Sequence, residues 1–96
     1  MAIQSFSDAD TEKFYLTGQF GKRVGWASIS RIARRKLDMI HPAARLDDLK
    51  APPGNRLEAL SGDLKGFHSI RINEQWRIVF RWTDAGPDEV RISDYH

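Results

Sequence analysis

The chain has 96 residues, and its 15 lysines and arginines against 13 aspartates and glutamates leave a formal net charge of +2. With 41% hydrophobic and 29% charged residues it has the composition of a soluble globular protein, and we expect one domain over residues 1–96 with a modest core. The absence of cysteine excludes disulfides and thiolate metal sites, and three scattered histidines lack ligand spacing (His41, His68 and His96). We therefore expect neither a metal nor any other cofactor.

The N-terminus, MAIQSFSDAD, carries acidic residues where a signal peptide would need basic residues and an apolar run. No segment approaches the length of a membrane span. These features predict a cytoplasmic protein that does not contact a membrane.

The first residues predict a short strand followed by a helix. Ile3 to Phe6 is the strand candidate. Ser7, followed three residues later by Asp10, resembles a capping box that opens a helix. That helix would run through Tyr15 or Leu16, and the glycines at 18 and 21 would end it.

A second helix is predicted from about Ser28 until Pro42 stops or kinks it, and residues 43–49 would form a further turn. Apolar residues recur at helical spacing along it and are most simply core. These residues are Ile29, Ile32, Ala33, Leu37 and Ile40.

Positive charge is concentrated in this first half, because seven basic residues and no acidic one lie from Lys13 to Lys36. Such a run would attract a phosphate backbone by releasing counterions. A solvated helix face is an equally good interpretation of the same pattern. The candidate RNA contacts of this run are Arg31, Arg34 and Arg35.

The second half alternates apolar and polar residues in the manner of β-strands, over residues 67–73, 76–82 and 90–95. A three-residue loop at 73–75 sets Ile72 opposite Trp76 and Arg71 opposite Arg77. With this register one sheet face is apolar and the other carries the arginines. Arginines share one face. The aromatic and aliphatic residues of the other face, the tryptophans at 76 and 82 included, are expected to be core.

The last strand would bring a tyrosine to the arginine face. If Trp82 pairs with Val90 across a loop from Thr83 to Glu89, Tyr95 lies opposite Arg77. Other registers of the same parity keep both side chains on that face but offset them. The order of elements predicts an α+β domain, with the N-terminal strand and two helices on one face of an antiparallel sheet.

Several segments together resemble the HigB-type toxins of the RelE superfamily. They are NRLEAL and SGDLKG from residue 55, SIRINEQWRIVFRW from residue 69, and the terminal DYH; IARRKLDMI and PPGNRLEAL are similar too. The resemblance implies a small RelE-like fold and the toxin of a type II toxin-antitoxin system. Such toxins cut messenger RNA in the ribosomal A site, and a helix-turn-helix (HigA-type) antitoxin silences them.

The resemblance also implies site residues. Arg77 would stabilise the charge of the phosphorane, and Tyr95 would position the nucleotide. Arg71 shares their face, and neighbouring like charges favour a bound anion. In the competing interpretation Arg77 merely pairs with Glu58 or Asp94 on an exposed sheet.

The chain departs from the family where some members carry a histidine and a lysine as the acid-base pair, because Glu58 and Ser61 stand there. Glu58 can act as base only with a raised pKa, and serine is a poor acid. His96 is a further proton carrier, unless the chain end frays. Lys65 is either a phosphate contact or part of a solvated turn.

The resemblance implies a ribosome-dependent endoribonuclease, and these departures predict that it is weak. Two alternatives stay open. One is a non-cleaving ribosome- or RNA-binding module on the same scaffold, and the other is a protein-interaction domain whose arginines meet an acidic partner.

Overall fold

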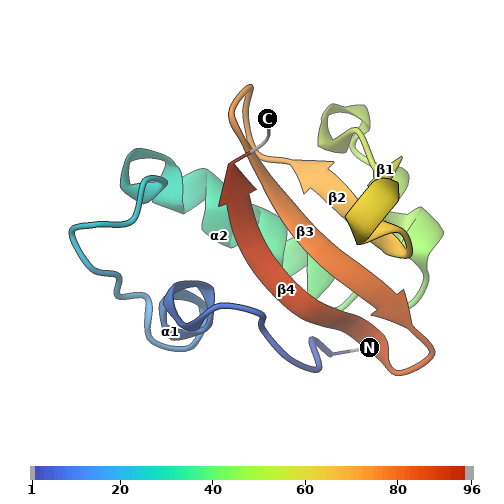
Figure 1. Ribbon diagram of the computed structural model, residues 1–96, viewed down its shortest axis with the longest axis horizontal. Helices are drawn as coiled ribbons and strands as arrows, with labels where there is room; N and C mark the ends of the chain where they lie inside the picture. Colours follow the sequence, from blue (N-terminus) through green and yellow to red (C-terminus); the bar gives the residue numbers. More distant parts are fainter. Residues whose placement is uncertain (1, 95–96) are drawn as a thin grey trace.

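The computed structural model describes residues 2–94, which fold into two α-helices and a sheet (Figure 1). Helix α1 spans Ala9–Thr17 and α2 spans Ser30–Ile40. Within the described residues the strands form a four-stranded antiparallel sheet in the order β1-β2-β3-β4. The strands are β1 Glu58–Ala59, β2 Phe67–Arg71, β3 Trp76–Thr83 and β4 Gly86–Asp94. Short 3-10 turns complete the fold: η1 Ala27–Ile29, η2 Leu46–Lys50, η3 Pro53–Asn55 and η4 Gly62–Leu64.

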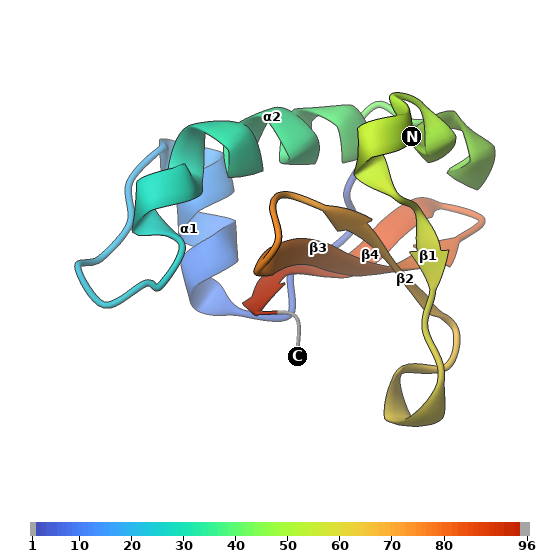
Figure 2. The same cartoon turned by 90° about the horizontal axis from the view of Figure 1, so that it is seen from above.

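The helices pack against the sheet as an α+β fold requires, which confirms the predicted class (Figure 2). Helix α2 crosses one sheet face, and its Ala33, Leu37 and Ile40 are fully buried. Helix α1 lies beside β4, where Thr11 Oγ1 accepts a hydrogen bond from the Ile92 backbone N–H at 3.1 Å. No helix among residues 2–94 is long and apolar enough to span a membrane.

The start of α1 differs from the capping box predicted at Ser7 and Asp10. Asp8 is the N-cap, and its carboxylate accepts a hydrogen bond from the Thr11 N–H at 2.6 Å. Ser7 instead donates its backbone N–H to the Val90 carbonyl, so it still belongs to the segment beside β4. Gly18 ends the helix in a left-handed conformation, as predicted.

The strand predicted at Ile3 to Phe6 is present only as an isolated parallel bridge between Phe6 and Val90. Its backbone contacts with β4 include Gln4 N–H to the Pro87 carbonyl at 2.8 Å and Val90 N–H to the Ser5 carbonyl at 3.0 Å. The pairing stays short because the chain turns into α1 directly after these contacts.

The apolar stripe predicted for α2 is mostly confirmed, but Ile32 is 38% exposed. A residue next to Ala33 is rotated by about 100° around the helix, which turns it away from the sheet. The helix therefore begins its buried face at Ala33 and carries one aliphatic side chain outside it.

The β2–β3 hairpin has the predicted register, with Arg71 opposite Arg77. The Asn73 side chain explains the tight connection, because its Oδ1 accepts from the backbone N–H groups of Gln75 at 2.9 Å and Trp76 at 2.7 Å. An asparagine can thus close the turn with its side chain.

The β3–β4 connection is tighter than predicted, so the proposed pairing of Trp82 with Val90 is wrong. Strand β4 starts at Gly86, and Trp82 pairs with Pro87. A bulge follows, with Glu89 at φ 50°, and beyond it Arg77 pairs with Ser93. Proline and glycine suggested a loop here, but this outer strand tolerates a residue without an N–H. Between the bulge and the end of β4 the register keeps the predicted parity, and before the bulge it does not. Tyr95 lies outside the described residues.

The predicted apolar face is the core of the molecule. Ile70, Ile78, Phe80 and Val90 are fully buried there, and the tryptophans at 76 and 82 pack against them partly buried. The opposite face of the sheet is only partly open to solvent. Val79 on that face is 4% exposed, and it borders a hollow also lined by Leu60 and Leu64.

Candidate functional site

Arg77 lies on the sheet face opposite α2, near the start of β3, and it is buried there with only 6% exposure. Its Nε donates to Ser69 Oγ at 2.7 Å, and its Nη2 donates to the Arg56 carbonyl at 2.8 Å. Ser69 is itself fully buried on β2. Two hydrogen bonds from different nitrogens fix the plane of the guanidinium, so this arginine is more constrained than a surface arginine.

The Arg56 carbonyl is positioned by an unusual loop. Arg56 follows η3 with φ at 46°, the left-handed region that non-glycine residues seldom adopt. The adjacent Asn55 is fully buried, and its Nδ2 donates to the carbonyls of Leu49 at 3.1 Å and Ala51 at 3.2 Å. Lys36 of α2 donates to Asn55 Oδ1. The loop that holds Arg77 is therefore tied to the helix layer.

The contacts of Ser69, the Arg56 carbonyl and Asn55 form a frame that holds Arg77 in place. The sequence pattern did not predict Ser69 and Asn55 as parts of the site. A buried serine in a strand and an asparagine in a loop carry no pattern of their own. The NRLEAL motif, which begins at Asn55, was the only signal in the sequence, and its position before the sheet did not reveal its role.

Glu58 lies beside the frame on β1, with its Oε2 3.6 Å from Arg77 Nη2. This is the pairing that the competing interpretation of Arg77 expected. The carboxylate is about half exposed and Arg77 is buried, so the arginine belongs to the interior and not to an exposed sheet. Water at the glutamate weakens the attraction of the pair.

Arg77 borders two hollows. The first, of about 210 Å³, is lined by Arg56, Arg71, Asn73, Glu74 and Arg77. The second, of about 140 Å³, lies under Leu60 and Leu64 and reaches Ser69, Val79, Ser93 and Asp94. Three arginines around one small hollow, with a single carboxylate among its lining residues, form a site suited to a phosphate group.

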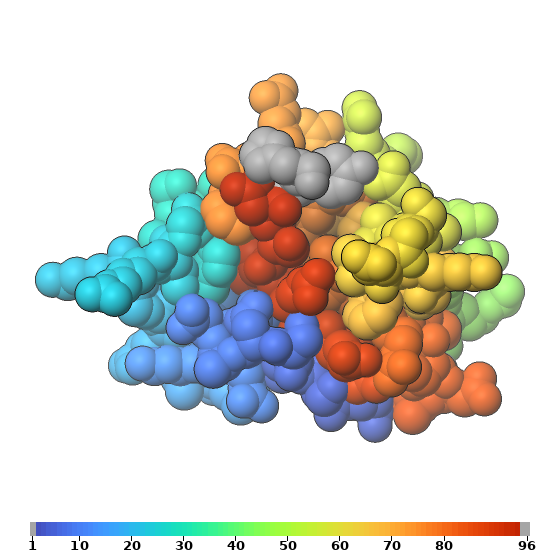
Figure 3. Space-filling view, viewed as in Figure 1, coloured from blue at the N-terminus to red at the C-terminus, as the bar shows by residue number. Residues whose placement is uncertain are grey.

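The segment around η4 stands out from this face beside β4 (Figure 3). Lys65 and Ser61 of this segment are exposed. Neither side chain lines the hollows beside Arg77. Lys65 therefore lies outside the immediate surroundings of the arginine frame.

The fold and this arrangement of arginines agree with the sequence relationships of the chain. Residues 4–96 match the family model of the RelE-like toxin HigB of type II toxin-antitoxin systems. The chain belongs to this family of toxins. It is 42% identical over 85 residues to Toxin HigB-1 of Vibrio cholerae, covering 88% of this chain and 87% of the relative. An uncharacterized protein of Haemophilus influenzae is 32% identical over 79 residues, 82% of this chain and 77% of that protein.

Solved structures share the fold at low sequence identity. A YoeB/ParE toxin from Agrobacterium tumefaciens superposes with a TM-score of 0.57 at 20% identity, over the full length of both chains. A chain of the YoeB-YefM complex from Staphylococcus aureus gives 0.55 at 16% identity, covering 100% of this chain and 99% of that one. The chain is thus a HigB-type member of the RelE superfamily, the toxin of a toxin-antitoxin system with an antitoxin as partner.

The predicted RNA contacts of the toxin fall on two sides of the sheet. Arg71 joins Arg77, whereas the three arginines of α2 lie in the helix layer on the opposite side (Figure 2). One flat RNA-binding surface cannot include both groups.

The remaining candidate site residues are not part of the frame around Arg77. Arg81 is 48% exposed and pairs with Asp88 at 3.0 Å and Glu89 at 3.3 Å, so it is peripheral. Tyr95 and His96, the predicted aromatic and proton carrier, lie outside the described residues. Their roles stay predictions.

Proposed function

We propose that this toxin is a weak endoribonuclease that cuts messenger RNA on the ribosome and thereby inhibits translation. The observation that carries the proposal is the buried, doubly hydrogen-bonded Arg77 beside a hollow that two further arginines line. A guanidinium that is already oriented stabilises developing charge without reorganising during the reaction. Membership of the HigB family supports the same function.

In this mechanism the hollow bordered by Arg56 and Arg71 receives the scissile phosphate. Arg77 stabilises the phosphorane as the 2′-hydroxyl attacks the phosphorus and the 5′-oxygen leaves. Arg71, opposite Arg77 on β2, binds the neighbouring phosphate, since phosphate contacts position a nucleic acid. Lys65 is a more distant contact with the RNA backbone.

Proton transfer is assigned to two residues. Glu58, 3.6 Å from Arg77, accepts the proton of the 2′-hydroxyl, and His96 donates one to the leaving oxygen. Tyr95 positions the nucleotide. Because Glu58 and Ser61 replace the histidine and lysine of some family members, we expect slow cleavage that depends on groups of the ribosome.

The alternative function is a non-cleaving ribosome- or RNA-binding module. The observation that favours it is the contact of Arg77 with Glu58, because a carboxylate beside the guanidinium reduces its attraction for phosphate. Both functions place RNA on the same sheet face, and they differ only in chemistry.

Cleavage of the same message, measured with and without ribosomes, distinguishes the endoribonuclease from the binding module. Purified toxin is added to the message bound in ribosomes that are translating it, and to the same message without ribosomes. The proposal expects cuts only in the ribosome-bound sample. Binding to ribosomes without cuts would establish the alternative, and equal cleavage of both samples would contradict ribosome dependence.

We further propose that the antitoxin is a helix-turn-helix protein of the HigA type and that the toxin acts in the cytoplasm, where ribosomes are. Co-purification of the toxin with the product of an adjacent gene tests the first point. A partner without a helix-turn-helix domain would contradict it.

A further inference from the structure

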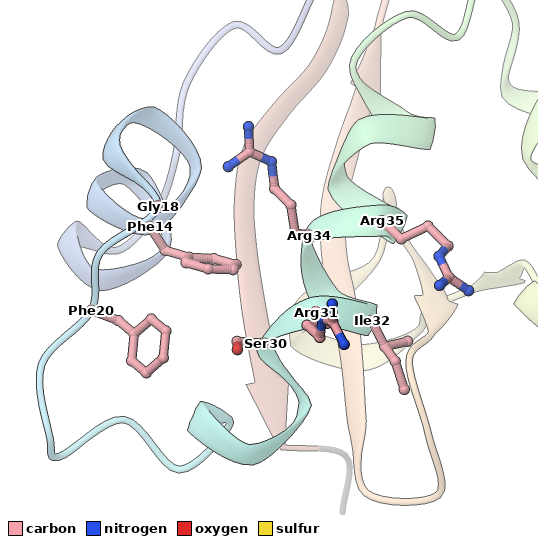
Figure 4. A pocket seen from close by; sticks show the side chains of 8 residues that line it. All are labelled: Phe14, Gly18, Phe20, Ser30, Arg31, Ile32, Arg34 and Arg35. Carbon is pink, nitrogen blue, oxygen red and sulfur yellow. The ribbon is translucent and has the colours of Figure 1, made fainter.

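A groove of about 740 Å³ lies between α1 and α2 (Figure 4). It is on the helix side of the sheet, away from Arg77. Phe14 and Phe20 line it from α1 and the segment that follows. Arg31, Ile32, Arg34 and Arg35 line it from the first half of α2. The groove thus combines apolar side chains with three cationic ones.

Its charge is concentrated and largely unneutralised. Arg31, Arg34 and Arg35 are spaced three and four residues apart, which places them on one helix face where like charges repel. Arg34 pairs with Asp38 at 3.3 Å and lies 5.0 Å from the centre of the Tyr15 ring. Among residues 2–94, Arg31 and Arg35 are exposed and have no ion-pair partner. A ligand with carboxylates would relieve this repulsion.

Its apolar side chains favour a protein ligand over RNA. Ile32 of α2 lines the groove and is 38% exposed, so its aliphatic side chain is accessible to a ligand. Phe14 is only 4% exposed because it packs against Phe20 and Trp26, so its ring is not free to stack on a base. RNA grooves need accessible aromatic rings, whereas aliphatic side chains suit an amphipathic helix.

We propose that the groove between α1 and α2 docks an acidic, amphipathic helical segment of the antitoxin. Apolar residues of that segment would contact Ile32 and Phe20, and its carboxylates would pair with Arg31 and Arg35. This inference rests on the groove and on membership of a toxin-antitoxin family, and it does not depend on RNA cleavage. A partner bound here would leave the Arg77 face uncovered, because the two lie on opposite sides of the sheet.

Charge reversal in the groove is the direct test. The double substitution Arg31→Glu with Arg35→Glu is compared with Lys22→Glu and Arg23→Glu, which change the same charge in the same basic run outside the groove. Binding of the purified antitoxin is measured by calorimetry, and circular dichroism checks that each variant folds. We expect the groove variant to bind at least about tenfold more weakly and the control to change by less than about twofold.

A neutral substitution and an RNA probe separate protein from RNA binding. Ile32→Ser should weaken antitoxin binding and leave the affinity for a fluorescein-labelled single-stranded RNA unchanged. Hydrogen exchange of the complex should show protection in residues 14–20 and 30–35. Equal antitoxin affinity of the groove variant and its control would overturn the proposal. Loss of RNA binding with antitoxin binding intact would instead assign the arginines to RNA.

Discussion

Arg77 Nε donates a hydrogen bond of 2.7 Å to Ser69 Oγ, and both residues are buried on the sheet face opposite α2. The two side chains come from neighbouring strands, so the register of β2 and β3 brings them together. A hydroxyl at this place fixes an arginine without neutralising it. Arg77 therefore keeps its positive charge and gains an orientation that a surface arginine lacks, and the proposed cleavage needs both.

Replacing Ser69 by alanine should lower both stability and activity. The change leaves the buried Nε of Arg77 without its acceptor, at a cost of about 1–3 kcal/mol in the free energy of unfolding. Ser69→Thr keeps the hydroxyl and should recover much of the lost toxicity. Urea unfolding and growth after induction are the measurements, with Ser28→Ala at an exposed position as control. Wild-type toxicity of folded Ser69→Ala would show that the hydrogen bond does not position Arg77.

Arg77→Lys should abolish most of the cleavage while preserving charge. Lysine cannot form the forked contacts with Ser69, the Arg56 carbonyl and a phosphate at once. Losing one preorganised contact costs about 3 kcal/mol of transition-state stabilisation, on the order of a hundredfold in rate. The rate on ribosome-bound message is measured for folded protein, with Arg81→Ala as the peripheral control.

The burial of Arg77 changes what its alanine variant is expected to do. An arginine outside the apolar face would be expected to leave the fold intact when it is replaced by alanine. With Ser69 and the Arg56 carbonyl both deprived of their donor, Arg77→Ala should also lose about 1–3 kcal/mol of stability. A melting temperature equal to that of the wild type would contradict this frame.

Much of the fold follows from alternation along the strands, and the outcome for each element has a physical reason. Parity placed Ile70 and Ile78 in the core and Arg71 opposite Arg77, because a slip of one residue would expose a buried face. The β3–β4 register was wrong because Gly86 and Pro87 resemble a loop. In the structure they start an outer strand whose proline needs no partner for an N–H.

The site was only partly predictable. Arg71 of β2 and Arg77 of β3 share a sheet face, and the alternation of residues along the strands predicts this. The Arg56 carbonyl and buried Asn55 come from a loop whose path depends on tertiary packing, so no local sequence pattern predicts their positions. Likewise the arginines of α2 appear in one basic run with no acidic residue, but the helix carries them to the opposite side of the sheet.

Glu58→Gln should reduce cleavage if this carboxylate accepts the proton of the 2′-hydroxyl. The amide has the same shape and cannot take the proton, so the fold should be unaffected at this half-exposed position. Glu58→His with Ser61→Lys restores the family's residues and should increase cleavage. Rates on ribosome-bound message test both. Faster cleavage by Glu58→Gln would show that the carboxylate only weakens Arg77.

Acid should loosen the contact of the N-terminal segment with β4 through Asp88. Hydrogen bonds from Ser5 and Arg81 hold the pKa of this carboxyl below its ordinary value of 3.8. Because the pKa of Asp88 is lower in the folded than in the unfolded state, its carboxylate stabilises the protein above pH 3.8. This stabilisation is lost as the pH falls through the folded-state pKa.

Asp88→Asn should therefore reduce the free energy of unfolding by about 1 kcal/mol at pH 7 and by less below pH 3.8. Urea unfolding across this range measures the difference. Asp84→Asn in the neighbouring turn, whose carboxylate has no ion-pair partner among residues 2–94, should behave like the wild type. A constant difference between Asp88→Asn and wild type at all pH values would rule out this linkage.

The most direct test of the central claim is a map of transcript 5′ ends in bacteria after brief induction of the toxin without its antitoxin. The proposed function expects new ends inside translated regions, no increase in untranslated ones, and few new ends for Arg77→Lys produced at the same level. Halted growth without new ends would contradict cleavage and favour the binding module. New ends spread equally over translated and untranslated RNA would contradict action on the ribosome.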